Sequence, residues 1–437
     1  MDVFQSLQEA CAHPDSLFAC SEEDLINLLY KEFPEDIDRL KRAYSIRDGP
    51  WTPPNTPSPS YILYKDNYDE VNRTLVGFLA LRWIHTDQYE SFIGAQSPAQ
   101  LTRESFDWIR QFYRQAITDA NTLYTLIYSI IINDLGKDPQ LATDYHAQTG
   151  HDISILNHDA ILLQACKQGL VPSLDRLRAE DRQDVLQAIT LGATFNFGQL
   201  AQAENAPVCL TALHGMKYFK RSMQIRFMEQ ILDIAGAAGH MDWTCAKKLI
   251  QSIFEGYRHV YEIYEGVMSD RLTLRSGYDL ILIRKAEYLG QFSDKELRRF
   301  DIESDPRDRA LVRLFCMGNV TMRDKALLYQ AAWDALDEET RGMLERALNV
   351  DGARGEPAVQ PTYMPALFGR VLGQNALVAA FRFLCRVMSA TDIGDPEAVV
   401  IERSVYKVLK EVVESDEFQK DPTILERVDV PEGVAAL

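Results

Sequence analysis

Apolar residues recur mostly at intervals of three and four along this chain, the spacing that places side chains on one face of an α-helix. Few segments are rich enough in Val, Ile and Thr to resemble β-strands, so the pattern predicts an all-α protein. We expect long helices at residues 69–89, 103–132 (broken near 119–121), 211–235, 242–267 and 275–289. Shorter helices should begin at Ser21, which opens a capping-box pattern, and at Thr321.

Two stretches rich in Pro and Gly interrupt this pattern and divide the chain into three expected parts. Residues 49–60 hold five of the 18 prolines, and residues 351–362 form a second linker. We therefore expect N-terminal helices with a Pro-rich connector over residues 1–60 and a large multi-helix catalytic body over 61–350. Residues 351–437 should form a linker, a C-terminal helical appendage and an acidic tail.

Charge and cysteine usage narrow the class of protein. The 437 residues carry a net charge of −18, with 46 basic and 64 acidic side chains, which argues against a general nucleic-acid binder and against DNA as a partner. The seven cysteines are scattered and form no C-x-x-C pair. No apolar stretch is long enough to span a bilayer, and the N-terminus lacks the pattern of a signal peptide. These features predict a soluble cytoplasmic protein without a membrane partner.

The candidate chemistry lies in a concentration of histidines and carboxylates. An apolar helix is expected to end in the run Asn133-Asp134-Leu135-Gly136-Lys137, and the pair His158-Asp159 follows about twenty residues later. Six of the eight histidines fall between His146 and His259, and His214 is one of them. Histidine with carboxylate is typical of metal ligation and of proton transfer near neutral pH. We take Asp134, His158, Asp159 and His214 as candidate catalytic residues.

Structural roles explain several of these residues equally well. Asp134 is compatible with a plain helix end, with Lys137 near the helix carbonyls. His158 and Asp159 are compatible with a surface N-cap, for which Asn157 is also suitable.

Two further groups of side chains are candidates for substrate binding. Lys217, Lys220, Arg221 and Arg226 lie in one expected helix with aromatic residues between them. This basic face is compatible with phosphate contacts and also with a solvated face carrying i,i+4 ion pairs.

The second group is Glu255 and Glu262, on an expected helix with three tyrosines alongside. These carboxylates are suited to hold a guanidinium or ammonium group. They are equally suited to an internal ladder with Arg258.

The run Asn133-Asp134-Leu135-Gly136-Lys137 resembles a degenerate H-D-x-G-K signature of the HD superfamily. This resemblance, over residues 80–260, implies an HD-domain-like all-α core and a metal-dependent phosphohydrolase. The implied ligands of a divalent metal are His85, Asp134 and His158. Asn133 stands where that family has a metal-binding histidine, and asparagine is a poor ligand for a transition metal.

The strings I-I-N-D-L-G-K-D and N-H-D, in an acidic all-helical chain, are similar to the fungal arginine-containing cyclodipeptide synthases. This resemblance implies transfer of aminoacyl groups from two charged tRNAs, one of them arginyl-tRNA, to form a diketopiperazine in natural-product biosynthesis. It implies no metal or other cofactor, because the tRNA ester is already activated. The family's D-D-x-x-E motif is absent, and Glu180-Asp181-Arg182-Gln183-Asp184 is its nearest variant.

Three hypotheses follow from these observations. In the synthase, Glu255 and Glu262 receive the arginine side chain, His158 or His214 acts as general base, and Asp134 orients the base or neutralises the substrate ammonium. The basic strip from Lys217 to Arg226 contacts the tRNA. The alternatives are an HD-type phosphohydrolase that uses metal-activated water and a non-catalytic helical scaffold that binds a basic partner.

Overall fold

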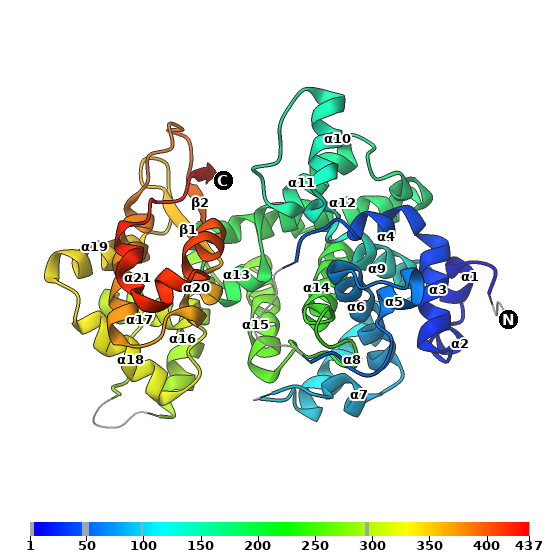
Figure 1. Ribbon diagram of the computed structural model, residues 1–437, viewed down its shortest axis with the longest axis horizontal. Helices are drawn as coiled ribbons and strands as arrows, with labels where there is room; N and C mark the ends of the chain where they lie inside the picture. The colour runs from blue at the N-terminus through cyan, green and yellow to red at the C-terminus, as the bar shows by residue number, and fades with distance from the viewer. Residues whose placement is uncertain (1–3, 46–51, 98, 293–296, 437) are drawn as a thin grey trace. The chain divides into compact units, whose positions relative to one another are not determined.

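The computed structural model describes residues 4–45, 52–97, 99–292 and 297–436 (Figure 1). Part of the expected Pro-rich connector, residues 49–51, lies outside them. Helices dominate, and the structure adds a small three-stranded sheet that the spacing of apolar residues did not predict. The chain divides into two compact units: unit 1 contains residues 1–193 and 215–255, and unit 2 contains 194–214 and 256–437.

The first unit is entirely helical in its described residues. Its α-helices are α1 (Leu7–Cys11), α2 (Pro14–Phe18), α3 (Glu22–Glu32), α4 (Pro34–Leu40), α5 (Pro59–Tyr64), α6 (Asp69–His85), α7 (Tyr89–Ile93), α8 (Arg103–Ala116), α9 (Ala120–Ile132), α10 (Pro139–Thr149), α11 (His158–Lys167), α12 (Ala179–Thr194) and α14 (Lys220–Gly236). Short 3-10 helices lie at Leu135–Lys137 and Pro172–Arg176.

Helices α6, α9 and α14 form the centre of unit 1 (Figure 1). Almost every residue of α6 and α9 is buried, as expected for helices that are apolar around most of their circumference. The backbones of α6 and α14 meet at glycines. A Cβ on Gly77 would lie 2.8 Å from the carbonyl oxygen of Leu232, and one on Gly236 would lie 2.1 Å from that of Arg73. Side chains of both helices therefore face the same narrow space.

The second unit contains the sheet and the remaining helices. They are α13 (Phe197–Ala201), α15 (Gln251–Met268, within which the unit boundary falls), α16 (Leu274–Gly290), α17 (Pro306–Met317), α18 (Arg323–Asp334), α19 (Glu338–Asn349), α20 (Met364–Arg370), α21 (Gln374–Ser389), α22 (Tyr406–Val408) and α23 (Asp416–Lys420). Pro207–Met216 and Pro422–Arg427 are 3-10 helices, and Leu409–Val413 is a π-helical turn.

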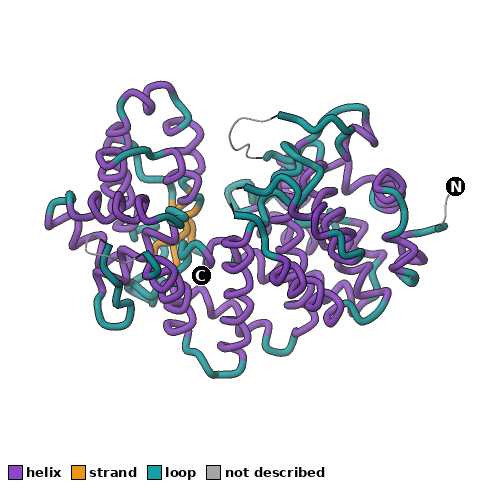
Figure 2. Tube along the Cα trace, turned by 90° about the horizontal axis from the view of Figure 1, so that it is seen from below, coloured by secondary structure: helices purple, strands orange, loops and turns teal. Residues whose placement is uncertain are grey.

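Strand β1 (Ala358–Thr362) pairs in parallel with β2 (Val400–Ser404), and β2 pairs antiparallel with β3 (Gly433–Ala435), as the orange segments in Figure 2 show. The register places Ala358 opposite Val400. Strand β1 lies at the edge of the sheet, a position that tolerates Pro361. Its polar residues and proline hid this strand in the expected linker.

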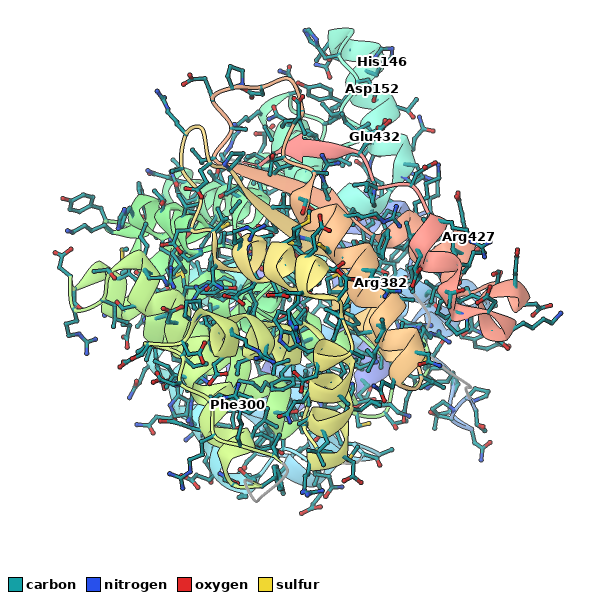
Figure 3. The ribbon with its side chains drawn as sticks, turned by 90° about the vertical axis from the view of Figure 1, so that its left-hand side faces the viewer. His146, Asp152, Phe300, Arg382, Arg427 and Glu432 are labelled. Atoms are coloured by element: carbon teal, nitrogen blue, oxygen red, sulfur yellow. The ribbon has the colours of Figure 1, made fainter. Side chains whose placement is uncertain are left out.

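Helices α20 and α21 connect the two parallel strands, and α21 carries two arginines, of which Arg382 is labelled in Figure 3. Arg386 donates hydrogen bonds to the carbonyl oxygens of Leu425 and Val428, at 2.7 and 2.8 Å. Arg382 forms an ion pair with Glu426 at 2.9 Å. The expected acidic tail is therefore partly tied to α21 and contributes strands β2 and β3.

Several expected helix boundaries are confirmed. Ser21 caps α3, the expected helix at 103–132 is broken into α8 and α9, and α16 covers the expected 275–289. No helix in the described part of the chain is long and apolar enough to cross a membrane.

Four expected helices are wrong in extent. The one at 69–89 ends at His85, because Asp87 adopts a left-handed conformation with φ of 61°. The one at 211–235 begins only at Lys220. The one at 242–267 begins at Gln251, because the Asp242 carboxylate accepts hydrogen bonds from Thr244 and favours a turn. Helix α18 begins two residues after Thr321, so that residue is not its cap.

Unit 2 contains a buried carboxyl, Glu204, which is 1% exposed and has no cationic partner among the described residues. The backbone N–H of Met364 donates to its Oε1 at 2.7 Å. Burial raises the pKa of Glu204 to about 8, against the opposing effect of this hydrogen bond. A raised pKa means that the fold favours the protonated form. The contribution of Glu204 to stability is thus complete below its unfolded pKa of about 4.5 and is lost as the pH rises through 8.

We predict that Glu204→Gln stabilises the protein relative to wild type at pH 9 and has little effect at pH 5, because glutamine keeps the acceptor oxygen without a charge. The difference should be at most about 5 kcal/mol, from a pKa of about 8 against an unfolded value of about 4.5. Thermal unfolding of both proteins from pH 5 to 9 measures it, with the exposed Glu356→Gln as control. An unchanged pH dependence in Glu204→Gln would contradict the prediction.

Candidate functional site

Every residue of the run 133–138 except Leu135 has a specific polar or backbone contact. Asn133 binds Arg226, Asp134 binds Lys137, Gly136 packs against the backbone of His158, Lys137 binds Glu70, and Asp138 accepts hydrogen bonds from Arg39 and Arg42 while capping α10. The run joins the end of α9 to α4, α6, α11 and α14.

Gly136 brings the histidine at the start of α11 next to Asp134. A Cβ on Gly136 would lie 1.9 Å from the carbonyl oxygen of His158, so only glycine permits this approach. The His158 Nε2 atom lies 3.8 Å from Asp134 Oδ1. Asn157 caps α11 through the backbone N–H of Ala160, as the N-cap interpretation of this segment expected. Asn157 therefore caps α11 in the same structure in which His158 lies next to Asp134.

Lys137 is the central cation of the site. Its ammonium group lies 2.8 Å from Glu70 Oε1 and 2.8 Å from Asp134 Oδ1. Ser45 also donates a hydrogen bond to Glu70, and Arg73 lies 3.2 Å from the same carboxylate. Because all three ionisable partners are buried, each depends on the others for compensation of its charge.

Burial and ion pairing shift the pKa values of the carboxyls of Glu70 and Asp134 in opposite directions. Burial raises the pKa of Glu70, and the attraction of Lys137 only partly offsets it. Burial alone would also raise the pKa of Asp134, but Lys137 more than compensates and lowers it. Asp134 is therefore ionised near neutral pH. The simple interpretation of Asp134 as a helix end accounts for its position at the end of α9 but not for this ion pair.

Arg226 forms a second buried network. Its guanidinium donates to Glu229 Oε2 at 2.8 Å, to Asn133 Oδ1 at 3.3 Å and to Asp159 Oδ2 at 3.2 Å. Gly192 of α12 permits this packing, since a Cβ there would lie 2.4 Å from Arg226 Nη2. Burial raises the pKa of Glu229 to about 8, although Arg226 opposes the shift.

A narrow cleft opens between α6, α9 and α14 of unit 1. It is lined by Arg73, Thr74, Gly77, Ile130, Asn133, Asp134, Glu229, Leu232 and Asp233. Its free volume is about 10 Å³, enough for a single group the size of a water molecule. Three carboxyls line it, and no described residue supplies a hydrogen-bond partner to Asp233. Arg73 lines the same cleft, so cations of the chain oppose these carboxyls, and a small cationic group such as an ammonium is compatible with the cleft.

The expected metal ligands are not brought together. His85 pairs with Asp15 at 2.8 Å and packs on Phe18. It lies fifteen residues beyond Glu70 on α6, about 22 Å along the helix axis. In the described residues, no group of three or more His, Cys, Asp or Glu side chains is arranged to hold a metal. Lys137 and Arg226 already compensate the carboxylates, so this donor set does not fit a divalent metal.

The expected basic strip is only partly exposed. Arg226 is 2% exposed and faces the interior, which corrects its assignment to a tRNA-binding surface. Arg221 pairs with Asp181 at 2.6 Å and with Asp184, the acids of the degenerate D-D-x-x-E variant. Lys217 and Lys220 remain on the surface.

The remaining candidates are Glu262 and Glu255, which interact with other residues of the chain, and His214, which is exposed. Glu262 pairs with Arg284 at 2.6 Å and with Arg258 at 3.6 Å, which confirms the internal ladder. Glu255 accepts a hydrogen bond from Gln251 at 2.9 Å. His214 is exposed on the 3-10 helix of unit 2.

Three residues of the site were missed in the sequence: Glu70, Glu229 and Asp233. On α14, Arg226, Glu229 and Asp233 recur at spacings of three and four, a charged stripe on a largely apolar helix. That stripe was a usable signal. Glu70 gave none, because nothing in the sequence associates it with Lys137.

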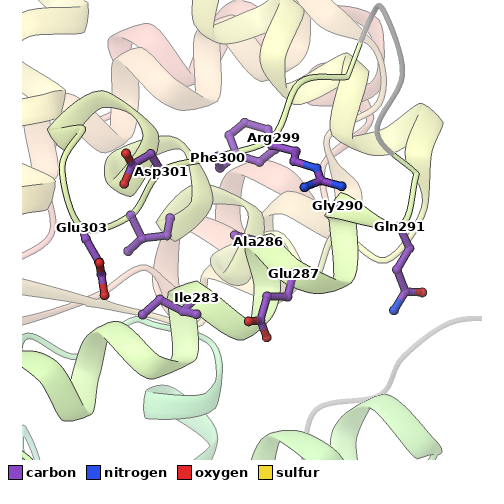
Figure 4. A pocket seen from close by; sticks show the side chains of 10 residues that line it. Ile283, Ala286, Glu287, Gly290, Gln291, Arg299, Phe300, Asp301 and Glu303 are labelled. Atoms are coloured by element: carbon purple, nitrogen blue, oxygen red, sulfur yellow. The ribbon is translucent and has the colours of Figure 1, made fainter.

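Unit 2 has a separate open hollow of about 650 Å³, between α16 and residues 299–303 (Figure 4). Its lining includes the apolar side chains of Ile283, Ala286 and Phe300 and the charged side chains of Glu287 and Arg299. None of the residues expected at a functional site lines it.

A sequence profile that describes a family of unknown function, DUF6829, matches residues 26–425. The chain belongs to this family. The matched region includes the whole cluster around Lys137 and Arg226. No curated protein and no solved structure matched the chain in our comparisons. An HD-domain-like core remains a prediction from the sequence.

We predict that Gly136→Ala destabilises unit 1 by at least about 2 kcal/mol, because the added methyl group displaces the start of α11. Gly215→Ala is the matched control, since a Cβ there meets no atom within 4 Å. Urea unfolding measures both variants. Equal stability of the two would show that the contact between Gly136 and His158 is not tight.

We also predict that Lys137→Met costs about 3–5 kcal/mol of stability, because Glu70 and Asp134 lose their shared cation. Adding Glu70→Gln should recover part of this loss by removing one buried charge. Chemical unfolding of wild type and of the single and double variants tests this coupling. A double variant no more stable than Lys137→Met would contradict it.

Proposed function

We propose that this protein transfers aminoacyl groups between charged tRNAs in the cytoplasm and forms an arginine-containing cyclodipeptide. The observation that carries the proposal is the cleft lined by Asp134, Glu229 and Asp233. Its size and charge suit the α-ammonium group of an aminoacyl ester. The similarity to the arginine-containing cyclodipeptide synthases supports the choice of reaction.

The first step requires a free amine. An α-amino group has a pKa near 8, and the raised pKa of Glu229, about 8, makes its carboxylate a matched proton acceptor. Asp134, which stays ionised beside Lys137, holds the ammonium before transfer. Glu229 thus replaces His158 and His214 as the preferred general base in this account.

The bonds balance without an added energy source. The amine nitrogen attacks the ester carbonyl of the second aminoacyl-tRNA, a C–N bond forms, and the C–O bond to the ribose breaks. The ribose oxygen leaves with a proton, for which the partly exposed His158 beside Asp134 is a suitable donor. The second amine then attacks the remaining ester and closes the ring, releasing the other tRNA.

Recognition of arginine needs a carboxylate that the fold has not already paired. Glu262 is held by two arginines of the chain itself, which makes it a weak candidate. Asp233 lines the cleft without a hydrogen-bond partner among the described residues. We therefore assign the α-ammonium group of the arginine substrate to Asp233, and we do not assign its guanidinium to Glu262.

The test is a product assay with purified protein, bulk tRNA, aminoacyl-tRNA synthetases, ATP and all the amino acids. Mass spectrometry should detect arginine-containing diketopiperazines that disappear after RNase treatment. Absence of product while every tRNA is shown to be charged would contradict the proposal and favour the scaffold.

We predict that Glu229→Gln lowers the rate of product formation by about 10²- to 10⁴-fold, the usual effect of losing a general base. Wild-type activity should rise with pH to a plateau above about 8, because the active form of Glu229 is ionised. The part of this rise that belongs to Glu229 should be absent from Glu229→Gln, in which only the deprotonation of the substrate amine remains. The exposed Glu104→Gln is the control, and a Glu229→Gln enzyme with the wild-type rate and pH profile would exclude Glu229 as the base.

A further inference from the structure

The open hollow of unit 2 lies along one face of α16 (Figure 4). Ile283, Ala286 and Gly290 line it at spacings of three and four residues, so they share one side of the helix. From Ile283 to Gly290 the helix axis advances by about 10 Å. The volume of about 650 Å³ is within the range typical of sites that bind small organic ligands.

The lining of this hollow combines apolar side chains with a free main-chain amide. Phe300 and Ile302 lie across the hollow from α16 and make the lining more apolar than polar. The backbone N–H and C=O groups of Phe300 have no hydrogen-bond partner among the described residues. A ligand that carries both apolar side chains and amide groups is therefore complementary to this lining.

The charged side chains of the lining are left unpaired by the chain itself. Within the described residues, the guanidinium of Arg299 has no carboxylate in ion-pair distance, and the carboxylates of Glu287 and Glu303 have no cationic partner. Asp301 differ from them, because it accepts a hydrogen bond from the backbone N–H of Ser304 at 3.0 Å. Two carboxylates and one guanidinium are thus available to a ligand.

These charges are separated along the hollow. In Figure 4, Arg299 and the amide of Gln291 lie at one end, Glu303 lies at the other end, and Glu287 lies between them. A ligand that pairs with both ends has an anionic group and a cationic group separated by about the length of the hollow. Its middle part is apolar or basic.

We infer that this hollow binds a short extended peptide of about three residues whose two termini are free. The C-terminal carboxylate pairs with Arg299 through charge-assisted hydrogen bonds, and the N-terminal ammonium pairs with Glu303. An extended chain advances about 3.4 Å per residue, so three residues cover the length of about 10 Å. The apolar side chains of the peptide lie against Ile283 and Ala286.

Glu287 determines which peptides are preferred. It adds a second unpaired carboxylate, so a basic side chain in the middle of the peptide is favoured and an acidic one is repelled. This inference does not rest on the proposed function, because every residue that carries it belongs to unit 2.

The experiment is calorimetric titration of the full chain with four peptides. They are Leu-Lys-Leu with free termini, its C-terminal amide, its N-acetylated form and Leu-Glu-Leu. We expect the unmodified Leu-Lys-Leu to bind best, and each of the other three to bind about 3- to 10-fold more weakly. Absence of binding by all four peptides, or equal affinity for all four, would overturn the inference.

Two charge variants assign the ends of the peptide. Arg299→Gln should bind the free acid and the C-terminal amide equally, because the guanidinium that distinguishes them is gone. Glu303→Gln should likewise bind the free and the N-acetylated peptide equally. Arg370→Gln, at an exposed arginine of the same unit, is the control and should discriminate as wild type does. Full discrimination retained in Arg299→Gln and Glu303→Gln would place the peptide elsewhere.

A third variant fills the hollow without disturbing the fold. Gly290 lines the hollow, and a Cβ there meets no atom within 4 Å, so Gly290→Leu should unfold at or above the wild-type temperature. Its added side chain should weaken binding of Leu-Lys-Leu by at least about 10-fold. Gly369→Leu, on α20 with equally open space around its Cβ, is the matched control. Wild-type affinity in Gly290→Leu would show that the peptide does not occupy this hollow.

Discussion

The ammonium group of Lys137 is the constraint on which the site of unit 1 depends. It lies 2.8 Å from both Glu70 and Asp134, and all three side chains are buried. A buried charge without a partner costs stability. The two ion pairs of Lys137 therefore hold α6 close to the end of α9. Asp138, paired with Arg39, and Arg226, paired with Asp159, connect this cluster in the same way to α4, α11 and α14. The site is thus a network of compensated charges, and an additional metal cation is not needed to hold its carboxylates.

Glycines determine how closely this network is packed. Gly136 lets α11 approach the turn, Gly192 lets α12 approach Arg226, and Gly77 and Gly236 bring α6 and α14 into backbone contact. The remaining space is a cleft for one small group, with the free carboxylate of Asp233 on its wall. Its size excludes a larger group and its carboxyls are compatible with an ammonium, which is why we propose a substrate amine there.

The sequence predicted the helical class and the importance of residues 133–138, because helical spacing and a Gly-containing turn are local signals. It also predicted that Asp134 and His158 belong together. It missed β1, whose Gln360 and Pro361 hide a buried edge strand. It assigned Arg226 and Glu262 to a substrate surface, although Arg226 is buried in ion pairs and the partly exposed Glu262 is paired with Arg284. The pairs of Arg226 with Asp159 and of Glu262 with Arg284 join residues 67 and 22 positions apart, so no local pattern reveals these two pairs.

Calorimetric titration of the protein with L-argininamide tests the central claim most directly, with Nα-acetyl-L-argininamide as the matched ligand. The acetyl group removes the α-ammonium and leaves the guanidinium intact. We predict that wild type binds argininamide, that Asp233→Asn weakens this binding, and that the acetylated ligand binds poorly. Equal binding of the two ligands, or equal binding by wild type and Asp233→Asn, would contradict the assignment of the cleft to a substrate amine.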